Sequence, residues 1–325
     1  MKYVKDPFLL SLIAVVILAF NFPVRGSAAV FFDYLSYFVV ALLFFVHGAL
    51  LSRQSVIAGI THWRLHLFIF SCTFVLFPLL TFALRPLFAT QFPTEIIAGL
   101  IYLSLLPSTV QSSIAFTSIA KGNVPAAVCS ASVSNLIGVF LTPVLVGVLM
   151  KNNASGAAAG GLETIRDTVL QIFVPFVAGH LLHNKIGGWL GQRRLFTKAV
   201  DNGTILLVVF IAFSESVVSN TWGNISTIML LKLILVCSLL LALVMVIIYS
   251  VATAMKFNRE DKIAILFCGS KKTLANGLPM ARIIFSGIPI AGLILPLMIF
   301  HQVQLMVCSF LAQRFRRNLV KQQVQ

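Results

Sequence analysis

The sequence is poor in charge, and in acidic charge above all. Only 10% of its 325 residues are charged, and only nine are Asp or Glu. A soluble domain carries roughly 25% charged residues, whereas this chain is 59% hydrophobic and has a mean hydropathy of +0.99. So few charges cannot cover an apolar core in water, and we predict that the surrounding solvent is lipid.

Motifs of catalysis and of metal binding are missing as well. The chain contains no H-E-x-x-H, G-x-S-x-G, G-x-G-x-x-G or P-loop pattern. Its cysteines lie inside apolar runs without a C-x-x-C spacing, so they predict neither disulfides nor a metal site. These five residues are Cys72, Cys129, Cys237, Cys268 and Cys308. We therefore predict a protein that is not an enzyme and holds no cofactor, with an integral membrane enzyme as the weakest alternative.

Apolar segments of about the length of a membrane span fill the chain. A transmembrane helix needs roughly 20 such residues, and connections between the segments are short and polar. The segments are expected at 8–24, 30–51, 65–84, 96–120, 124–150, 167–184, 200–219, 226–254, 262–285 and 290–312. This pattern predicts an all-α polytopic membrane protein with ten transmembrane helices.

The basic residues are distributed unevenly over the connections. With the N-terminus in the cytoplasm, 16 lysines and arginines fall on the cytoplasmic side and 6 on the other side. This asymmetry follows the positive-inside rule, so the net charge of +15 indicates membrane topology and not nucleic-acid binding. We predict an integral protein of the bacterial inner membrane with both termini in the cytoplasm.

Two five-segment halves, at 1–150 and 167–325, flank a linker at 151–166 that is rich in Gly and Ala. Because five is odd, the halves are predicted to lie in opposite orientations, as inverted repeats do in many secondary transporters. The fourth and ninth segments hold corresponding places, and both are interrupted by Pro or Gly beside polar residues. Paired broken helices indicate a transport site near the membrane midplane.

Lys271 and Lys272 are the most unusual residues of the ninth segment. A lysine at the centre of a bilayer costs roughly 2.5–3.5 kcal/mol, so two adjacent lysines require a reason. Either the ninth span begins later and both lie in a cytoplasmic loop, or at least one faces a wet cavity. There it would hold an anionic solute or substitute for a bound cation. Adjacent helical residues point about 100° apart, so the two need not share a role.

Other polar residues of the spans complete the candidate site. Hydroxyl and amide oxygens suit sodium, and half-helix N-termini attract anions, although ordinary helix packing is the competing interpretation for each residue taken singly. Glu215 either pairs with one of the two lysines or lies at the membrane interface. His301, and more weakly His47, suits either a proton relay or packing. The predicted solute- or ion-binding residues are Ser108, Thr109, Gln111, Ser112, Ser113, Asn135, Gly269, Ser270, Lys271, Lys272, Thr273, Asn276, Glu215 and His301.

The ninth segment also carries a resemblance to a known family. Residues 267–281, FCGSKKTLANGLPMA, resemble the divergent SBF-like branch of the bile acid:sodium symporter family. Supporting stretches are LPSTVQSS at 106–113, AFSES at 212–216 and FHQVQL at 300–305. The resemblance implies a ten-helix fold with a panel domain and a core domain, in which the broken helices four and nine cross and form the site.

The same resemblance implies sodium ligands on helices four, five and nine. Carried over by motif, Ser112, Ser113 and Asn135 are the positions expected to bind sodium. Helix nine departs from the family pattern because lysines stand where a glutamate is expected. A fixed ammonium repels sodium and could replace it electrostatically.

Together these features predict a secondary active transporter of a small organic, anionic solute that works by alternating access, with sodium coupling left open. The expected partners are the lipid bilayer and the solute, with no nucleic acid. The alternative is a membrane-embedded regulatory or interaction protein that keeps the fold without transport.

Overall fold

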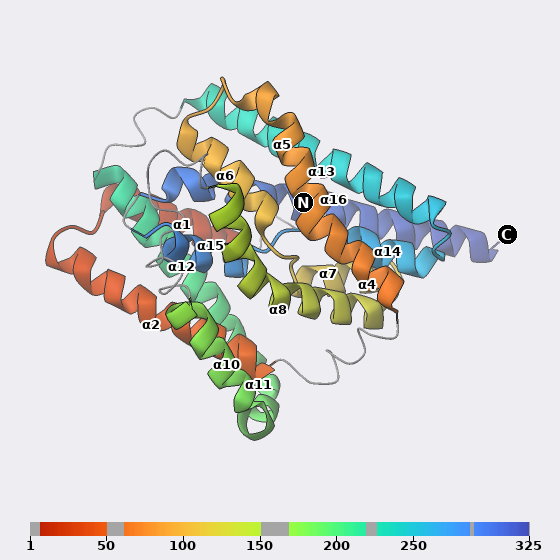
Figure 1. The fold of residues 1–325 in the computed structure, drawn as a ribbon, viewed down its shortest axis with the longest axis horizontal. Coiled ribbons are helices and arrows are strands. Elements are labelled where there is room, and N and C mark those ends of the chain that lie inside the picture. Colours follow the sequence, from red (N-terminus) through yellow and green to blue (C-terminus); the bar gives the residue numbers. More distant parts are fainter. Residues whose placement is uncertain (1–6, 51–61, 151–168, 219–225, 287–288, 325) are drawn as a thin grey trace.

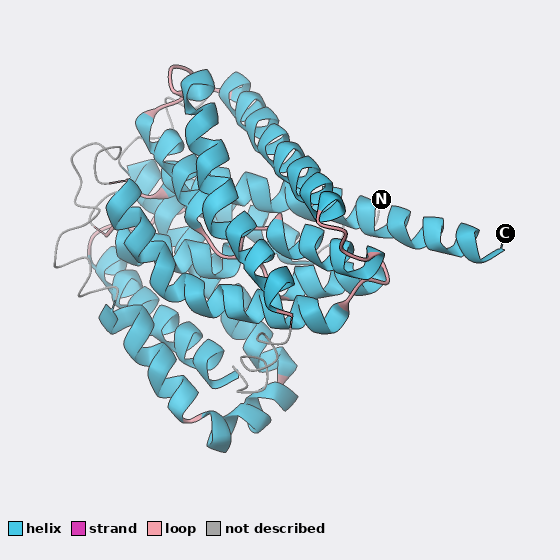
Figure 2. Cartoon of the chain, turned by 45° about the vertical axis from the view of Figure 1, so that its right-hand side comes forward, coloured by secondary structure: helices cyan, strands magenta, loops and turns pink. Residues whose placement is uncertain are grey.

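The computed structural model describes residues 7–50, 62–150, 169–218, 226–286 and 289–324. Within these ranges all regular structure is helical (Figure 2), which confirms the predicted all-α class. The predicted linker at 151–166 lies outside the described residues.

Six of the helices are long and apolar enough to cross a membrane by length and composition. They span Ser27–Leu50, Trp63–Phe88, Val124–Leu149, Arg194–Val218, Thr227–Ala254 and Ala291–Leu319. Shorter apolar helices run over Leu10–Asn21, Thr94–Leu105 and Leu170–Leu181. The chain therefore has the helices of an integral membrane protein.

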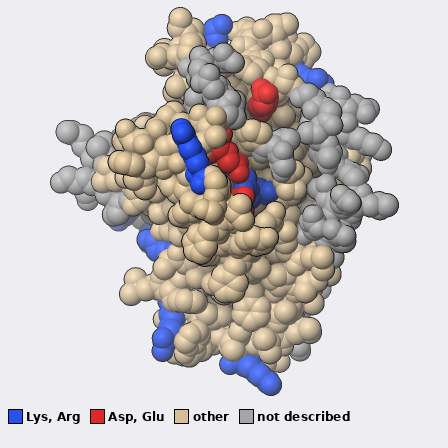
Figure 3. Space-filling view, turned by 90° about the vertical axis from the view of Figure 1, so that its left-hand side faces the viewer, with Lys and Arg blue, Asp and Glu red and all other residues tan. Residues whose placement is uncertain are grey.

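The outer surface agrees with a lipid environment. Helix α13 (Thr227–Ala254) exposes Leu231, Leu235 and Leu239 by 62%, 68% and 55%, and their spacing of four places them on one face of the helix. Figure 3 shows a face of the molecule on which few side chains are acidic or basic. Apolar side chains that are exposed in such numbers are explained by contact with lipid tails.

The two interruptions predicted from the sequence are present. The fourth segment consists of α6 (Thr94–Leu105) and α7 (Gln111–Ile119), joined by non-helical residues around Pro107. The ninth segment consists of α14 (Arg259–Gly269) and α15 (Leu274–Ile284). In each pair, the first half-helix ends and the second half-helix begins in the interior of the molecule.

The third segment contains an irregularity that the sequence pattern does not reveal. Helix α4 (Trp63–Ser71) passes through a π-helical turn, η2 (Cys72–Leu76), into α5 (Phe77–Phe88). Pro78 explains the turn, because a proline ring inside an α-helix clashes with the carbonyl four residues earlier. The wider π-helical turn accommodates the ring.

The helices form two groups (Figure 1). In one group, α2 (Ser27–Leu50) packs against α10 (Val174–Leu181) and α12 (Arg194–Val218), which also packs against α1 (Pro7–Asn21). The second group contains the broken helices, α8 (Val124–Leu149), α13 and α16 (Ala291–Val324), together with α4 and α5. Helix α15 contacts both α12 and α16. The remaining short elements are η3 (Val169–Phe173), η4 (His183–Gly187) and α11 (Gly188–Gln192).

Helices α2 and α10 approach each other through a reciprocal pair of glycines. A Cβ atom on Gly48 would collide with the backbone carbonyl of Phe176, and one on Gly179 would collide with that of Phe45. Small residues permit such close backbone contact between membrane helices. The backbones of the two helices are therefore in close contact at these glycines.

Replacing Gly48 with alanine should force α2 and α10 apart. We expect a loss of about 1–3 kcal/mol, the usual cost of overpacking, measured as a lower melting temperature of the detergent-purified protein. Gly147→Ala is the matched control, because a Cβ there meets nothing within 4 Å. An equal effect of the two substitutions would contradict the close-contact explanation.

Candidate functional site

The two interrupted segments cross each other at their breaks. The backbone N–H of Thr273 donates to the carbonyl of Pro107 at 3.0 Å. The Ser108 hydroxyl donates to the carbonyl of Cys268 at 2.6 Å, and the Ser113 hydroxyl donates to that of Phe267 at 3.1 Å. Each break thus satisfies backbone groups that the other exposes, as a membrane interior requires.

Gln304 of α16 holds the second break in place. Its side-chain oxygen accepts from the backbone N–H of Lys272 at 2.9 Å, and its amide nitrogen lies 2.9 Å from the Lys272 carbonyl. The same nitrogen lies 2.9 Å from Nδ1 of His301. Gln304 is fully buried, and a buried amide paired on both sides fixes the backbone it binds.

Lys272 is directed away from solvent, into the crossing. Its ammonium donates to the carbonyls of Thr73, Ser104 and Leu106, each at 2.7 Å. It also lies 4.2 Å from the centroid of the Phe77 ring. The residue is 0% exposed.

Lys271 points elsewhere and has different neighbours. Its ammonium lies 3.2 Å from the Ser112 hydroxyl and 4.4 Å from the centroid of the Phe116 ring. It too is 0% exposed, so neither lysine has the solvent exposure expected of a cytoplasmic loop. The two lysines lie in one break and have separate partners.

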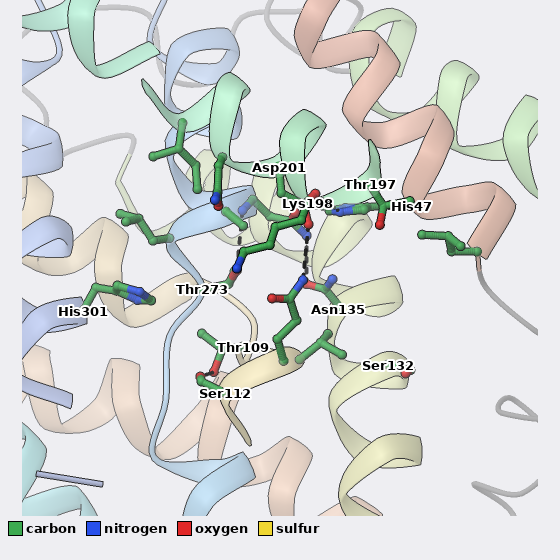
Figure 4. Close-up of a pocket in the computed structure, with 18 of the residues that line it drawn as sticks. His47, Thr109, Ser112, Ser132, Asn135, Thr197, Lys198, Asp201, Thr273 and His301 are labelled. Atoms are coloured by element: carbon green, nitrogen blue, oxygen red, sulfur yellow. Dashed lines mark hydrogen bonds and ion pairs between the residues drawn. The ribbon is translucent and has the colours of Figure 1, made fainter. Parts of the chain in front are cut away.

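A cavity of about 460 Å³ lies beside the crossing, between the two groups of helices (Figure 4). One wall comes from α1, α2, α10 and α12, and the other from α7, α8, α15 and α16. Seven of the predicted site residues line it. They are Thr109, Gln111, Ser112, Asn135, Thr273, Asn276 and His301.

Two half-helices begin at this cavity. Gln111 is the first residue of α7 and Leu274 is the first of α15, and both residues line the cavity. The first turn of a helix has backbone N–H groups without intrahelical partners, and the helix dipole makes that end positive. The two helix starts therefore place positive dipole ends at this wall.

The opposite wall carries charged residues from α12. Lys198 and Asp201 both line the cavity (Figure 4). Nε2 of His47 lies 2.8 Å from one Asp201 oxygen, and the Gln111 amide donates to the other at 3.4 Å. Asp201 thus joins the two groups of helices at the cavity. Sequence reasoning missed Lys198 and Asp201, because charged residues near a helix start are usually solvated.

Four predicted site residues lie at the crossing without lining the cavity. Ser108 and Ser113 are buried and bond to α14, Ser270 donates to the carbonyl of Leu266 at 2.6 Å, and Gly269 ends α14. Ser108, Ser113 and the two lysines bond across the crossing, whereas the Ser270 hydrogen bond is local to α14.

Glu215 requires a correction. Its predicted pairing with Lys271 or Lys272 is wrong, because both of its oxygens accept from Nη1 of Arg282 at 2.8 Å. Arg282 also forms an ion pair with Asp33 of α2. This cluster joins α2 and α12 to α15 and is not part of the cavity wall.

The hydroxyls predicted as sodium ligands are already occupied. Ser112 Oγ lies 2.9 Å from Thr109 Oγ1 and 3.2 Å from the Lys271 ammonium. Ser113 Oγ donates to Phe267 and lies 3.2 Å from Thr109 Oγ1. A sodium ion bound there would face a positive charge within hydrogen-bonding distance of one of its ligands.

The amide predicted as a third ligand is occupied too. The side-chain oxygen of Asn135 accepts from the Asn276 amide at 2.8 Å. These residues as arranged do not fit a sodium ion.

Comparison with known proteins places these features in context. Residues 6–317 match the model of the SBF-like CPA transporter family. The chain is 49% identical over 326 residues to the Escherichia coli protein named "Putative symporter YfeH", covering 99% of this chain and 96% of that protein. It is 50% identical over 317 residues to the uncharacterized protein PA2026 of Pseudomonas aeruginosa, covering 98% and 95%. Sodium/bile acid cotransporter 7 of Mus musculus is 28% identical over 292 residues, covering 89% and 85%.

Proposed function

The chain belongs to the SBF-like CPA transporter family, and on that premise we propose that it is a secondary active transporter of a small organic anion. The family consists of transporters and not of enzymes, as the missing catalytic motifs predict. The observation that carries the proposal is the cavity between the two groups of helices, at which α7 and α15 both begin.

Alternating access explains the two groups of helices. We assign α1, α2, α10 and α12 to a panel domain and the remaining long helices to a core domain. The two halves, 1–150 and 167–325, then supply corresponding members to each domain as inverted repeats. Rocking of the core against the panel around a fixed site is the mechanism that such repeats support.

The cavity lies near one end of the panel helices. Phe8 near the start of α1, Leu50 at the end of α2 and Thr197 near the start of α12 all line it. With both termini in the cytoplasm, these are cytoplasmic ends, so we assign the structure to an inward-facing state in the inner membrane. The cluster of Asp33, Arg282 and Glu215 then closes the opposite side.

An anionic solute suits the charges around the cavity. The starts of α7 and α15 attract negative charge, and Lys198 offers an ammonium from the panel. Polar groups of Thr109, Asn135 and Asn276 supply hydrogen bonds. The Asp201 oxygens lie within hydrogen-bonding distance of His47 Nε2 and the Gln111 amide, which reduces their repulsion of an anion.

Substitution of Lys198 tests this assignment. A thermal-shift screen of the detergent-purified protein against organic anions, with cholate among them, should identify compounds that raise the melting temperature. For such a compound we expect Lys198→Gln to weaken binding about tenfold, since a hydrogen bond to a charged group contributes about 1.5–3 kcal/mol. Lys185→Gln is the control, because Lys185 is exposed and outside the cavity.

Uptake by proteoliposomes separates transport from the regulatory alternative. A transporter should accumulate the identified anion, and Lys198→Gln should reduce uptake at low anion concentration. Binding without uptake would favour an interaction protein that keeps the fold. Equal affinity of the two lysine variants would refute the placement of the site.

A further inference from the structure

We propose that Lys272 is a tethered cation, whose ammonium permanently fills a binding site for a small monovalent cation made by main-chain carbonyls at the crossing of the broken helices. The inference concerns the crossing and stands whether or not the neighbouring cavity transports an anion. Three carbonyl oxygens, from Thr73, Ser104 and Leu106, surround the ammonium at 2.7 Å each.

The Thr73 carbonyl is available because of Pro78. In a regular α-helix this oxygen would accept from the N–H of Phe77. In the π-helical turn that N–H donates to Cys72 instead. The next residue, Pro78, has no N–H. The third span therefore exposes a carbonyl that its own helix does not satisfy.

The other two carbonyls are available because α6 stops. Ser104 is the second-last residue of α6 and Leu106 follows its end, so neither carbonyl has a helical N–H four residues later to pair with. The next N–H, that of Ser108, donates to the Ser134 hydroxyl at 3.3 Å. The carbonyls of Ser104 and Leu106 are thus free to accept from the same ammonium as the carbonyl of Thr73.

The number of acceptors around Lys272 matches its charged form. An ammonium has three N–H donors, and there are three acceptors, whereas a neutral amine has two donors and would leave one carbonyl unpaired. The face of the Phe77 ring, 4.2 Å from Nζ, adds attraction for a cation. Full burial of the residue is tolerated because every donor has a partner.

Main-chain carbonyls are also the ligands by which membrane proteins hold monovalent cations in place of water. Gln304 holds the backbone of Lys272, so the point from which its side chain reaches the three carbonyls is fixed. A covalently attached ammonium cannot dissociate. Consequently, the crossing needs no exchangeable sodium or potassium ion to neutralise these carbonyls.

Two substitutions test the inference through cation rescue. Lys272→Ala removes the ammonium and leaves room for an ion, whereas Lys272→Met removes the charge and keeps the space filled. Thermal unfolding is measured for the full-length protein in detergent, in sodium chloride, methylammonium chloride and choline chloride at equal ionic strength. Both variants should melt below the wild type in choline chloride.

We expect sodium or methylammonium to raise the melting temperature of Lys272→Ala by roughly 3 °C or more over choline. The methionine variant and the wild type should not distinguish the salts. An alanine variant that is equally unstable, or remains unfolded, in all three salts overturns the inference. The wild-type measurement does not depend on folding of a variant, and a sodium-specific rise there would also overturn it. The experiment measures thermal unfolding alone, so its result does not depend on whether the protein transports an anion.

Discussion

Lys271→Met is expected to lower anion uptake at low substrate concentration by roughly tenfold or more, with little change in melting temperature. The Lys271 ammonium lies 3.2 Å behind the hydroxyl of Ser112, and Ser112 lines the cavity. An anion that contacts this hydroxyl would lie roughly 6 Å from the ammonium. At the effective dielectric of a protein site, that attraction amounts to about 2–3 kcal/mol.

The fold should tolerate this substitution, because methionine fills nearly the same space and no backbone carbonyl depends on the Lys271 ammonium for a hydrogen bond among the described contacts. Replacement of a buried charge by an apolar residue of similar volume is often neutral. Uptake into proteoliposomes and thermal unfolding should be measured on one preparation. Lys262→Met in α14 is the control, because its ammonium lies over the ring of Tyr249 and does not line the cavity. Unchanged uptake by Lys271→Met would exclude an electrostatic role for this lysine.

Arg282→Met is expected to destabilise the protein by roughly 2–3 kcal/mol. Arg282 lies between the carboxylates of Asp33 and Glu215, so its loss leaves two negative charges near each other. Breaking a fully buried pair costs about 3–5 kcal/mol. The expected loss is smaller because the side chains of Asp33 and Glu215 retain 39% and 31% exposure, and water screens them.

A double variant separates charge from packing in this cluster. Adding Glu215→Gln to Arg282→Met removes one of the two uncompensated charges, so it should restore part of the lost stability. Chemical unfolding of both variants and the wild type measures the difference as a coupling energy. If the double variant is less stable than Arg282→Met, the lost packing of the arginine side chain, and not charge, dominates.

The helices could be predicted from the sequence, because a long apolar run is a local signal of a helix that lies in lipid. The interruptions near Pro107 and Gly269 could be predicted too, since proline, glycine and clustered polar residues are local signals. The π-helical turn beside Pro78 could not. Proline in a membrane helix permits a kink, a break or a π turn, and packing of the neighbouring helices selects among them.

The candidate site was predictable only on the side of the broken helices. Thr109, Ser112 and Asn135 attract notice because they are polar within apolar runs. Lys198 and Asp201 face the same cavity but occur at the start of α12, where charged residues are ordinary. The partners of buried lysines were also beyond the sequence, because they are backbone carbonyls, which every residue carries.

Pro78 and Lys272 occur in opposite halves of the chain, yet their chemical needs are reciprocal. The proline withholds one hydrogen from the carbonyl of Thr73, and the lysine supplies one. If residue 78 had an N–H, the carbonyl of Thr73 could accept from it and would not need a hydrogen of the ammonium. An apolar residue at 272 would leave the same carbonyl without a hydrogen-bond donor. The two positions are therefore coupled through one carbonyl, although about two hundred residues of sequence separate them.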